Sequence, residues 1–291
     1  MSTSCVYPLP AERVFAFAEE TGFDGVEIMV TNDDVTRDAQ ALRRASSATG
    51  MPILSIHAPV LLLTHFVWGR DPKIKLERSA ELAVNTGADT VVVHPPFRWQ
   101  RGYAERFLDI VRETAARYDV HIAVENMFPW KVPGRTLAVY APGWDPRAMD
   151  CEDVTFDFSH AALSGVDARS YVRELGPRLR HVHLCDGTGP DEQGRVFDEH
   201  LLPGQGGQPV AETLQDLAAL GFDGHVVAEV NLRKAKDDDE RRILLTETLE
   251  FARTHLGQGR SSTNHLTDLR RDRLGALDTG SIRFPDSPTA D

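Results

Sequence analysis

Short runs rich in valine and isoleucine alternate with longer segments of helical period along most of this chain. Such short, almost continuously apolar runs are typical of strands that are buried on both faces of a parallel sheet. Parallel strands need a crossover of about a dozen residues or more, and the intervening segments have that length. The predicted strands are residues 4–7, 26–30, 53–57, 91–94, 122–125, 154–157, 181–184 and 226–229.

Eight strand–helix units of this length favour an α/β fold with a single (β/α)8 TIM barrel, which typically takes about 250 residues. An open doubly wound sheet is the alternative. A dinucleotide-binding domain is disfavoured, because no Gly-x-Gly-x-x-Gly opens the first helix. We therefore expect residues 1–256 to form the barrel. Residues 257–291 are polar, their five arginines balance their five aspartates, and we expect a mobile tail.

The composition limits the binding partners and the cellular compartment that we expect for this protein. The net charge of −12 argues against general adhesion to nucleic acid or to an anionic membrane. No apolar run approaches the roughly 20 residues that span a bilayer, and the first residues lack the pattern of a secretory signal. Three cysteines are too few for a disulfide framework. We expect a cytoplasmic protein with no membrane partner, and a homo-oligomer is compatible with these features.

The predicted strands end in residues that can bind a metal or transfer a proton. The carboxyl ends of barrel strands meet at one face, where active sites assemble. Buried carboxylates and imidazoles are costly without partners, and a divalent cation satisfies several of them together. The pattern therefore predicts a metal site. Its residues are His57, His94, Glu125, Asp157 with His160 three residues later, His183 with Asp186, and Glu229.

Three nearby features have more than one interpretation. Taken alone, a strand-end histidine or acid is more often a structural residue, and we expect Glu27 to cap a helix or to pair with a base. We expect only one of His181 and His183 to face the barrel interior, and Asp186 favours His183. The segment containing Asp198 and His200 is either a source of two more ligands or a solvated acidic loop.

These residues resemble the xylose-isomerase-like barrel superfamily, which includes sugar isomerases and epimerases and the endonuclease IV type of abasic-site endonucleases (AP endonuclease family 2). The segment 23–27, Phe-Asp-Gly-Val-Glu, looks like the second-strand signature of the isomerase and epimerase members. The resemblance covers about residues 3–256. It is carried further by Glu125-Asn126, Asp157-x-x-His160, His183-Leu184-x-Asp186 and Glu229.

The resemblance to the epimerase members implies four metal ligands, Glu125, Asp157, His183 and Glu229. It also implies that the two glutamates act as acid–base groups. The resemblance to endonuclease IV implies a three-zinc cluster with five further ligands, His57, His94, His160, Asp198 and His200. The Asn-Met-Phe-Pro-Trp segment after Glu125 departs from the Gly-containing loop of the nucleases, and the loop 202–206 looks more like that of the isomerases.

We therefore expect a metal-dependent isomerase or epimerase that acts on a sugar, sugar phosphate or related hydroxy-carbonyl compound through an enediolate. Mixed oxygen and imidazole ligands suit Mn²⁺, Zn²⁺, Co²⁺ or Mg²⁺. Glu125 and Glu229 are the expected acid–base groups, and His160 orients a ligand or contacts the substrate. The alternative is a zinc-dependent endonuclease that hydrolyses DNA phosphodiesters at abasic sites. A barrel that has lost activity and binds a partner is a third interpretation.

Basic and aromatic residues follow the strand ends. We expect Trp99, Trp130 and Lys131 to contact a small anionic or polyhydroxylated substrate, although basic residues are common on barrel loops and the tryptophans could instead plug the mouth. Interspersed acidic residues favour a small anion over a DNA duplex. The basic residues are Arg70, Lys73, Lys75, Arg98, Arg101, Lys131, Arg135, Arg233, Lys234 and Lys236.

Overall fold

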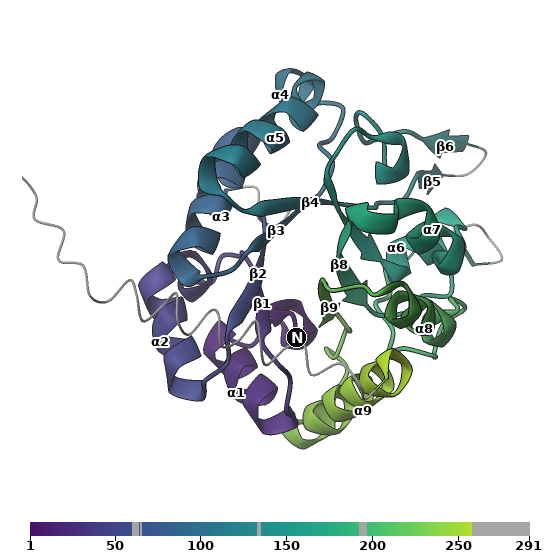
Figure 1. The fold of residues 1–291 in the computed structure, drawn as a ribbon. Helices are drawn as coiled ribbons and strands as arrows, with labels where there is room; N and C mark the ends of the chain where they lie inside the picture. Colours follow the sequence, from purple (N-terminus) through teal and green to yellow (C-terminus); the bar gives the residue numbers. More distant parts are fainter. Residues whose placement is uncertain (60–63, 65, 133–134, 192–196, 258–291) are drawn as a thin grey trace, which may run out of the picture. The chain divides into compact units, whose positions relative to one another are not determined.

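The structure, a computed structural model, describes residues 1–59, 64, 66–132, 135–191 and 197–257. Within this part, a ring of parallel strands is surrounded by helices, which confirms the α/β TIM barrel (Figure 1). The sheet has seven strands in the order β1-β2-β3-β4-β7-β8-β9. These are β1 (Val26–Met29), β2 (Ile53–His57), β3 (Thr90–Val93), β4 (His121–Glu125), β7 (Asp153–Asp157), β8 (Leu179–Leu184) and β9 (His225–Ala228).

The helices pack their apolar faces against the outside of this ring. Helix α3 begins and ends at residues with clear signals. Asp71 caps its N-terminus by accepting from the Lys73 N–H, and Gly87 ends it with a left-handed φ of 79°. The α-helices are α1 (Ala11–Thr21), α2 (Ala39–Thr49), α3 (Pro72–Thr86), α4 (Arg101–Glu105), α5 (Phe107–Tyr118), α6 (Phe158–Ser164), α7 (Ala168–Leu175), α8 (Val210–Leu220) and α9 (Asp238–Leu256).

Among the described residues, no helix combines the length and apolar character needed to cross a membrane. The connections in the same part of the chain contain four short 3₁₀ helices. They are η1 (Thr3–Val6), η2 (Asp34–Arg37), η4 (Pro146–Ala148) and η5 (Gly176–Arg178).

The prediction of a strand at residues 4–7 is wrong, because η1 occupies that segment. The apolar pattern there reflects burial, since the Cys5 and Val6 side chains are 0% and 1% exposed. The preceding two residues take the role of the missing strand. The Glu27 N–H donates to the Met1 carbonyl at 2.9 Å, and the Ser2 N–H donates to the Ala228 carbonyl at 2.9 Å. Met1 and Ser2 therefore bridge β1 and β9.

The connection between β4 and β7 contains a small hairpin that the sequence analysis did not predict. Its strands are β5 (Trp130–Val132) and β6 (Arg135–Leu137), which pair antiparallel. Strands of three residues are too short to show a two-residue period, so the pattern carries no signal.

The main hydrophobic core lies between the strands and the helices, while the barrel interior is largely polar. On β1, Val26 and Ile28 belong to the apolar core, whereas Glu27 turns inward and accepts from Ser55 on β2 at 2.8 Å. Alternate strand residues face opposite sides of a sheet, and Ser55 on β2 and His181 and His183 on β8 face the same interior, where each lies close to Glu27. Polar groups therefore line the interior that leads up to the strand ends.

Candidate metal centre

Four residues converge where β4, β7, β8 and β9 end. Glu125 and Asp157 are the last residues of β4 and β7, His183 is the penultimate residue of β8, and Glu229 directly follows β9. All four are buried, and each offers a ligand atom within 4.8 Å of the others. His183 Nδ1 lies 2.8 Å from Glu229 Oε2, 3.2 Å from Glu125 Oε1 and 3.7 Å from Asp157 Oδ2. The structure thus brings together all four residues of the predicted principal site.

A second group shares Glu125. His57 is the last residue of β2, and His94 directly follows β3. Their Nε2 atoms lie 3.3 Å and 3.0 Å from Glu125 Oε2. The other carboxylate oxygen of Glu125 faces His183 and also His160 Nδ1, at 3.2 Å. Both oxygens of Glu125 are therefore occupied by imidazoles.

A third group forms around Asp198. His160 lies on α6, and His200 lies in the loop between β8 and α8. Their Nε2 atoms lie 3.3 Å and 3.1 Å from the two carboxylate oxygens of Asp198. Asp157, His160 and His200 also offer ligand atoms within 4.8 Å of one another. All five residues suggested as further ligands therefore adjoin the principal site.

The histidines of the outer groups are oriented as metal ligands usually are. A carbonyl oxygen can only accept, so a ring nitrogen that contacts one carries the proton and leaves the other nitrogen directed elsewhere. In three histidines that other nitrogen is the Nε2 that faces the centre. The Nδ1 atoms donate as follows: His57 to Ala58 O at 3.1 Å, His160 to Asn126 O at 2.8 Å, and His200 to Glu229 O at 2.9 Å.

The charges also fit a cation. Burial alone would lower the pKa values of His160 and His183, but the facing carboxylates raise both well above the usual value. The pKa of His200 is raised in the same way, with Asp198 as the main acidic partner. Burial alone would raise the pKa of Glu125, yet the histidines around it hold that pKa well below its usual range. Protonated imidazoles thus balance the negative charge of the carboxylates, as a cation would. The set of imidazole and carboxylate donors fits divalent metal ions.

Comparison with known proteins decides the family. Residues 15–255 match the family model described as the xylose isomerase-like TIM barrel. The chain belongs to this family. The resemblance inferred from the strand-end residues is therefore confirmed.

Relatives within the family include an uncharacterized protein of Mycobacterium tuberculosis, 46% identical over 275 residues, which cover 88% of this chain and 96% of that protein. Fructoselysine 3-epimerase of Escherichia coli O157:H7 is 23% identical over 248 residues, 76% of this chain and 86% of the epimerase. Two solved structures share the fold. One is 3-keto-D-glucoside 4-epimerase from E. coli, with a TM-score of 0.62, 17% identity, and coverage of 87% of this chain and 98% of that one. The other is the IOLI protein with a bound zinc atom, with a TM-score of 0.58, 16% identity, and coverage of 87% of this chain and 93% of that one.

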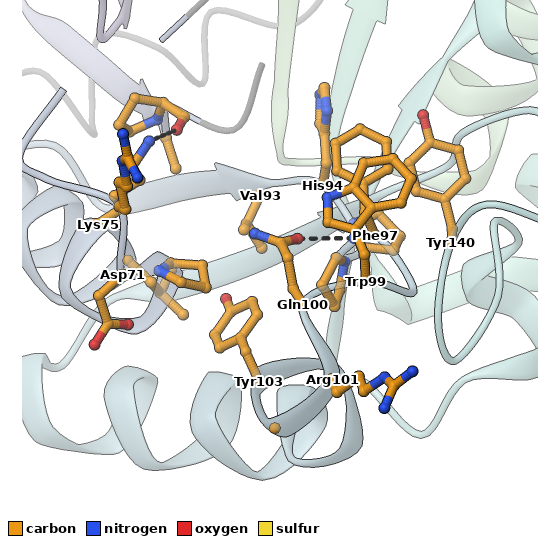
Figure 2. A pocket seen from close by; sticks show the side chains of 18 residues that line it. Asp71, Lys75, Val93, His94, Phe97, Trp99, Gln100, Arg101, Tyr103 and Tyr140 are labelled. Atoms are coloured by element: carbon orange, nitrogen blue, oxygen red, sulfur yellow. Dashed lines mark hydrogen bonds between the residues drawn. The ribbon is translucent and has the colours of Figure 1, made fainter. Parts of the chain in front are cut away.

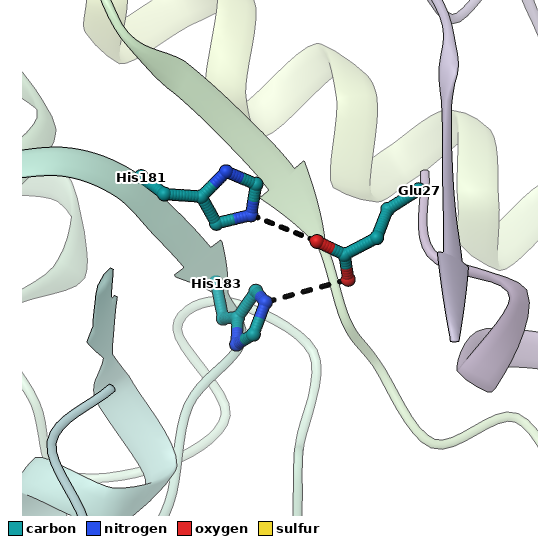
Figure 3. Close-up of side chains that lie close together, drawn as sticks. All are labelled: Glu27, His181 and His183. Atoms are coloured by element: carbon teal, nitrogen blue, oxygen red, sulfur yellow. Dashed lines mark ion pairs between the residues drawn. The ribbon is translucent and has the colours of Figure 1, made fainter. Parts of the chain in front are cut away.

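Glu27 and His181 lie beneath the centre of this xylose isomerase-like barrel, and their connection to it is not apparent from the strand-end pattern. The expectation that only one of His181 and His183 faces the interior is wrong, because residues two apart on a strand share a face. Figure 3 shows the Glu27 carboxylate beside both rings, with one oxygen directed at each. Its oxygens lie 3.0 Å from His181 Nε2 and 3.4 Å from His183 Nε2. Glu27 thus pairs with bases, which is one of the two roles expected for it.

Glu27 is placed to orient His183. When His183 Nδ1 faces the centre, its proton must sit on Nε2, which faces Glu27. Burial alone would raise the pKa of Glu27, but His183 and His181 hold it well below its usual range. Burial lowers the pKa of His181 to about 4. A charged Glu27 therefore favours the Nε2–H form of His183 through charge, since neither contact has the angles of a hydrogen bond.

We expect Glu27→Gln to weaken divalent metal binding by about 10- to 100-fold, the usual effect of losing an outer partner of a ligating histidine. The measurement is Zn²⁺ or Mn²⁺ affinity by competition with a chelator of known strength. Ser55→Ala is the control, since it removes a hydrogen bond to Glu27 but leaves the charge. Equal affinities of Glu27→Gln and the unmodified protein would contradict this role.

Asp186, which the motif match placed among the metal positions, anchors a loop instead. Its carboxylate accepts backbone N–H groups from Gly187 at 2.8 Å, Gly204 at 3.0 Å, Gly206 at 3.0 Å and Gln208 at 3.1 Å. A Cβ at Gly206 would overlap that carboxylate, which explains the glycine there. Asp186 therefore fixes the end of the loop that carries Asp198 and His200.

Some of the residues predicted to contact substrate lie around a cavity of about 490 Å³ beside the centre (Figure 2). Trp99 lines it and stacks on Phe97, with ring centroids 4.3 Å apart. Trp130 packs edge-on against Phe97, with ring centroids 6.1 Å apart, but it does not line the cavity. Lys131 lies on β5, and its side chain is outside the described part of the structure. Lys75 departs from the expected basic surface: it lies in α3 and is only 7% exposed.

Proposed function

We propose that this protein is a metal-dependent isomerase or epimerase of a sugar, sugar phosphate or related hydroxy-carbonyl compound. The observation that carries the proposal is the convergence of Glu125, Asp157, His183 and Glu229 at one face of the barrel. The similarity to fructoselysine 3-epimerase and to the fold of 3-keto-D-glucoside 4-epimerase supports it. A divalent cation held by these four residues would supply Lewis acidity toward the carbonyl and neighbouring hydroxyl oxygens of a substrate.

Glu229 is the better placed of the two glutamates to move a proton. Among the described residues its one ion pair uses Oε2 and His183, whereas both oxygens of Glu125 face histidines. Glu229 is also the more exposed, at 6% against 1%. We assign Glu229 to removal of the proton next to the carbonyl, which leaves an enediolate. Glu125 acts from the opposite side of the substrate as the second acid–base group.

His160 has a positioning role in this scheme. It is 3% exposed, and its two ring nitrogens contact Asn126, Glu125 and Asp198. These contacts orient the imidazole toward Glu125 and Asp198. His160 therefore holds Glu125 and Asp198 in place or serves as a further ligand.

The test is exchange of a carbon-bound proton. The protein, loaded in turn with Mn²⁺, Zn²⁺, Co²⁺ and Mg²⁺, is incubated in D₂O with a panel of ketoses and ketose phosphates. Loss of the proton signal next to the carbonyl, followed by NMR, is the expected result. Absence of exchange with every sugar and every metal would refute the proposal.

The five further ligand-type residues favour a second candidate, hydrolysis of phosphodiesters by a cluster of metal ions. Three groups of ligand atoms adjoin one another, and clustered metals can activate water and stabilise a leaving oxygen. Metal content by mass spectrometry separates the two candidates. About one ion per chain supports the isomerase, whereas about three zinc ions, together with nicking of a duplex that carries an abasic site, would support the nuclease.

A further inference from the structure

The cavity beside the metal centre has one end at the centre itself. His94 lines it, and His94 Nε2 lies 3.0 Å from Glu125 Oε2. The remaining walls come from the segments after β2 and β3, with Tyr140 completing the aromatic side. Figure 2 shows Lys75 across the cavity from His94, Phe97, Trp99 and Tyr140. A molecule with one end at the centre can therefore extend toward Lys75.

Lys75 carries a buried ammonium that donates to backbone carbonyls. Its Nζ donates to the carbonyl oxygens of Thr64 at 2.8 Å and Pro59 at 3.3 Å. In the described part of the chain, no carboxylate oxygen forms an ion pair with it. An ammonium can donate three hydrogen bonds, and a buried charge without a counter-charge is costly. The structure thus holds a positive charge at this wall of the cavity that the metal chemistry does not use.

The other charged residues of the cavity lining are also mostly positive. Arg70 and Arg101 line the cavity together with Lys75, against a single carboxylate, Asp71. Asp71 is engaged in capping α3 through the Lys73 N–H at 2.9 Å. In a protein with a net charge of −12, this lining is a local excess of positive charge. It favours an anionic ligand.

The wall opposite Lys75 is aromatic. Phe97 is stacked with Trp99 at 4.3 Å and with Tyr140 at 5.3 Å between ring centroids. Such flat surfaces pack against the apolar face of a sugar or an alkyl chain, while polar groups fix its orientation. The cavity therefore has an aromatic wall that can contact the middle part of a ligand between the metal centre and the Lys75 ammonium.

We propose that this cavity binds the end of the substrate remote from the reacting carbons, and that Lys75 recognises a terminal anion there, a phosphate or a carboxylate. The inference rests on the proposed isomerase or epimerase function and narrows its substrate class to sugar phosphates or sugar acids. Lys75 would then be a specificity-determining residue.

The test compares matched pairs of ligands on the metal-loaded protein. D-fructose 6-phosphate is paired with D-fructose, and D-galacturonate is paired with D-galactose, with binding measured by calorimetry and by tryptophan fluorescence. We expect the anionic member of at least one pair to bind about tenfold or more tightly, since hydrogen bonds to charged groups have that effect. The pair that shows the preference distinguishes phosphate from carboxylate.

Variants assign the preference to Lys75. Lys75→Met should reduce the ratio of affinities to near one, and Lys75→Arg should retain part of it. Lys73→Gln is the matched control, because Lys73 is exposed on the same helix and should keep the full ratio. Equal binding within both pairs by the unmodified protein, or an unchanged ratio in Lys75→Met, would overturn the inference. Should Lys75→Met fail to fold, the unmodified protein and Lys75→Arg still decide the question.

The outcomes also separate this inference from the proposed function. Proton exchange in D₂O without any preference for the anionic sugars would leave the isomerase standing and remove the subsite. A Lys75-dependent preference without proton exchange on any sugar would leave an anion site in a protein with a different activity.

Discussion

Replacing Glu229 by glutamine should lower the rate of carbon-bound proton exchange about 10³-fold or more at saturating metal. A positioned general base typically contributes 10²- to 10⁴-fold, and Glu229 is in addition a proposed metal ligand. Glutamine keeps the shape of the side chain but cannot accept the proton. The measurement is the exchange rate in D₂O with the sugar that the unmodified enzyme turns over, together with metal content and melting temperature.

Glu174→Gln is the matched control, since Glu174 is an exposed residue of α7 that pairs with Arg147. It should exchange protons at the unmodified rate. A Glu229→Gln variant that retains its fold, its metal and more than a tenth of its activity would remove Glu229 from the acid–base role.

Removing the metal should lower the melting temperature by about 10 °C at neutral pH. A ligand present at 1,000 times its Kd stabilises the native state by about 4 kcal/mol, and a domain of this size shifts by about 2–4 °C per kcal/mol. Differential scanning calorimetry of the metal-loaded and chelator-treated protein gives the difference directly. An unchanged melting temperature would favour the barrel that only binds a partner.

The difference should increase with pH. The pKa values of His160, His183 and His200 are raised well above the unfolded value of about 6.5. Their stabilisation of the metal-free protein is therefore fully present below about pH 6.5 and is lost as pH rises through the folded values. Metal binding requires neutral imidazoles and strengthens over the same interval. A difference that shrinks between pH 6 and pH 8.5 would contradict these protonation states.

The strand-end residues were predictable because each lies where a short apolar strand run ends and a segment of helical period follows. A buried parallel strand ends where the apolar run ends, so the side chains at 57, 94, 125, 157 and 229 fall on one face of any such barrel. His160 follows because it lies three residues beyond Asp157 on α6. These positions need no knowledge of long-range packing, which is why the sequence located them.

Other features depend on contacts that no local pattern encodes. The pairing of Glu27 with His181 joins residues about half the chain length apart, although the two-residue period of β8 already places His181 on the same face as His183. Lys75 reads as a surface residue until the packing of α3 buries it. η1 looks like a strand because burial and strand formation select the same residues at this position. The hairpin of β5 and β6 is too short to leave a period.

The four residues of the principal site come from four different strands, and His200 donates to the carbonyl of Glu229 from a loop between two of them. A cation at this position would act as a cross-link between successive β–α units rather than as a clamp within one. Amide hydrogen exchange in β4, β7, β8 and β9 should then slow as a single cooperative block when metal binds. Opening of any one of these units would release the metal, so loss of the cofactor and local unfolding of the barrel would be one event.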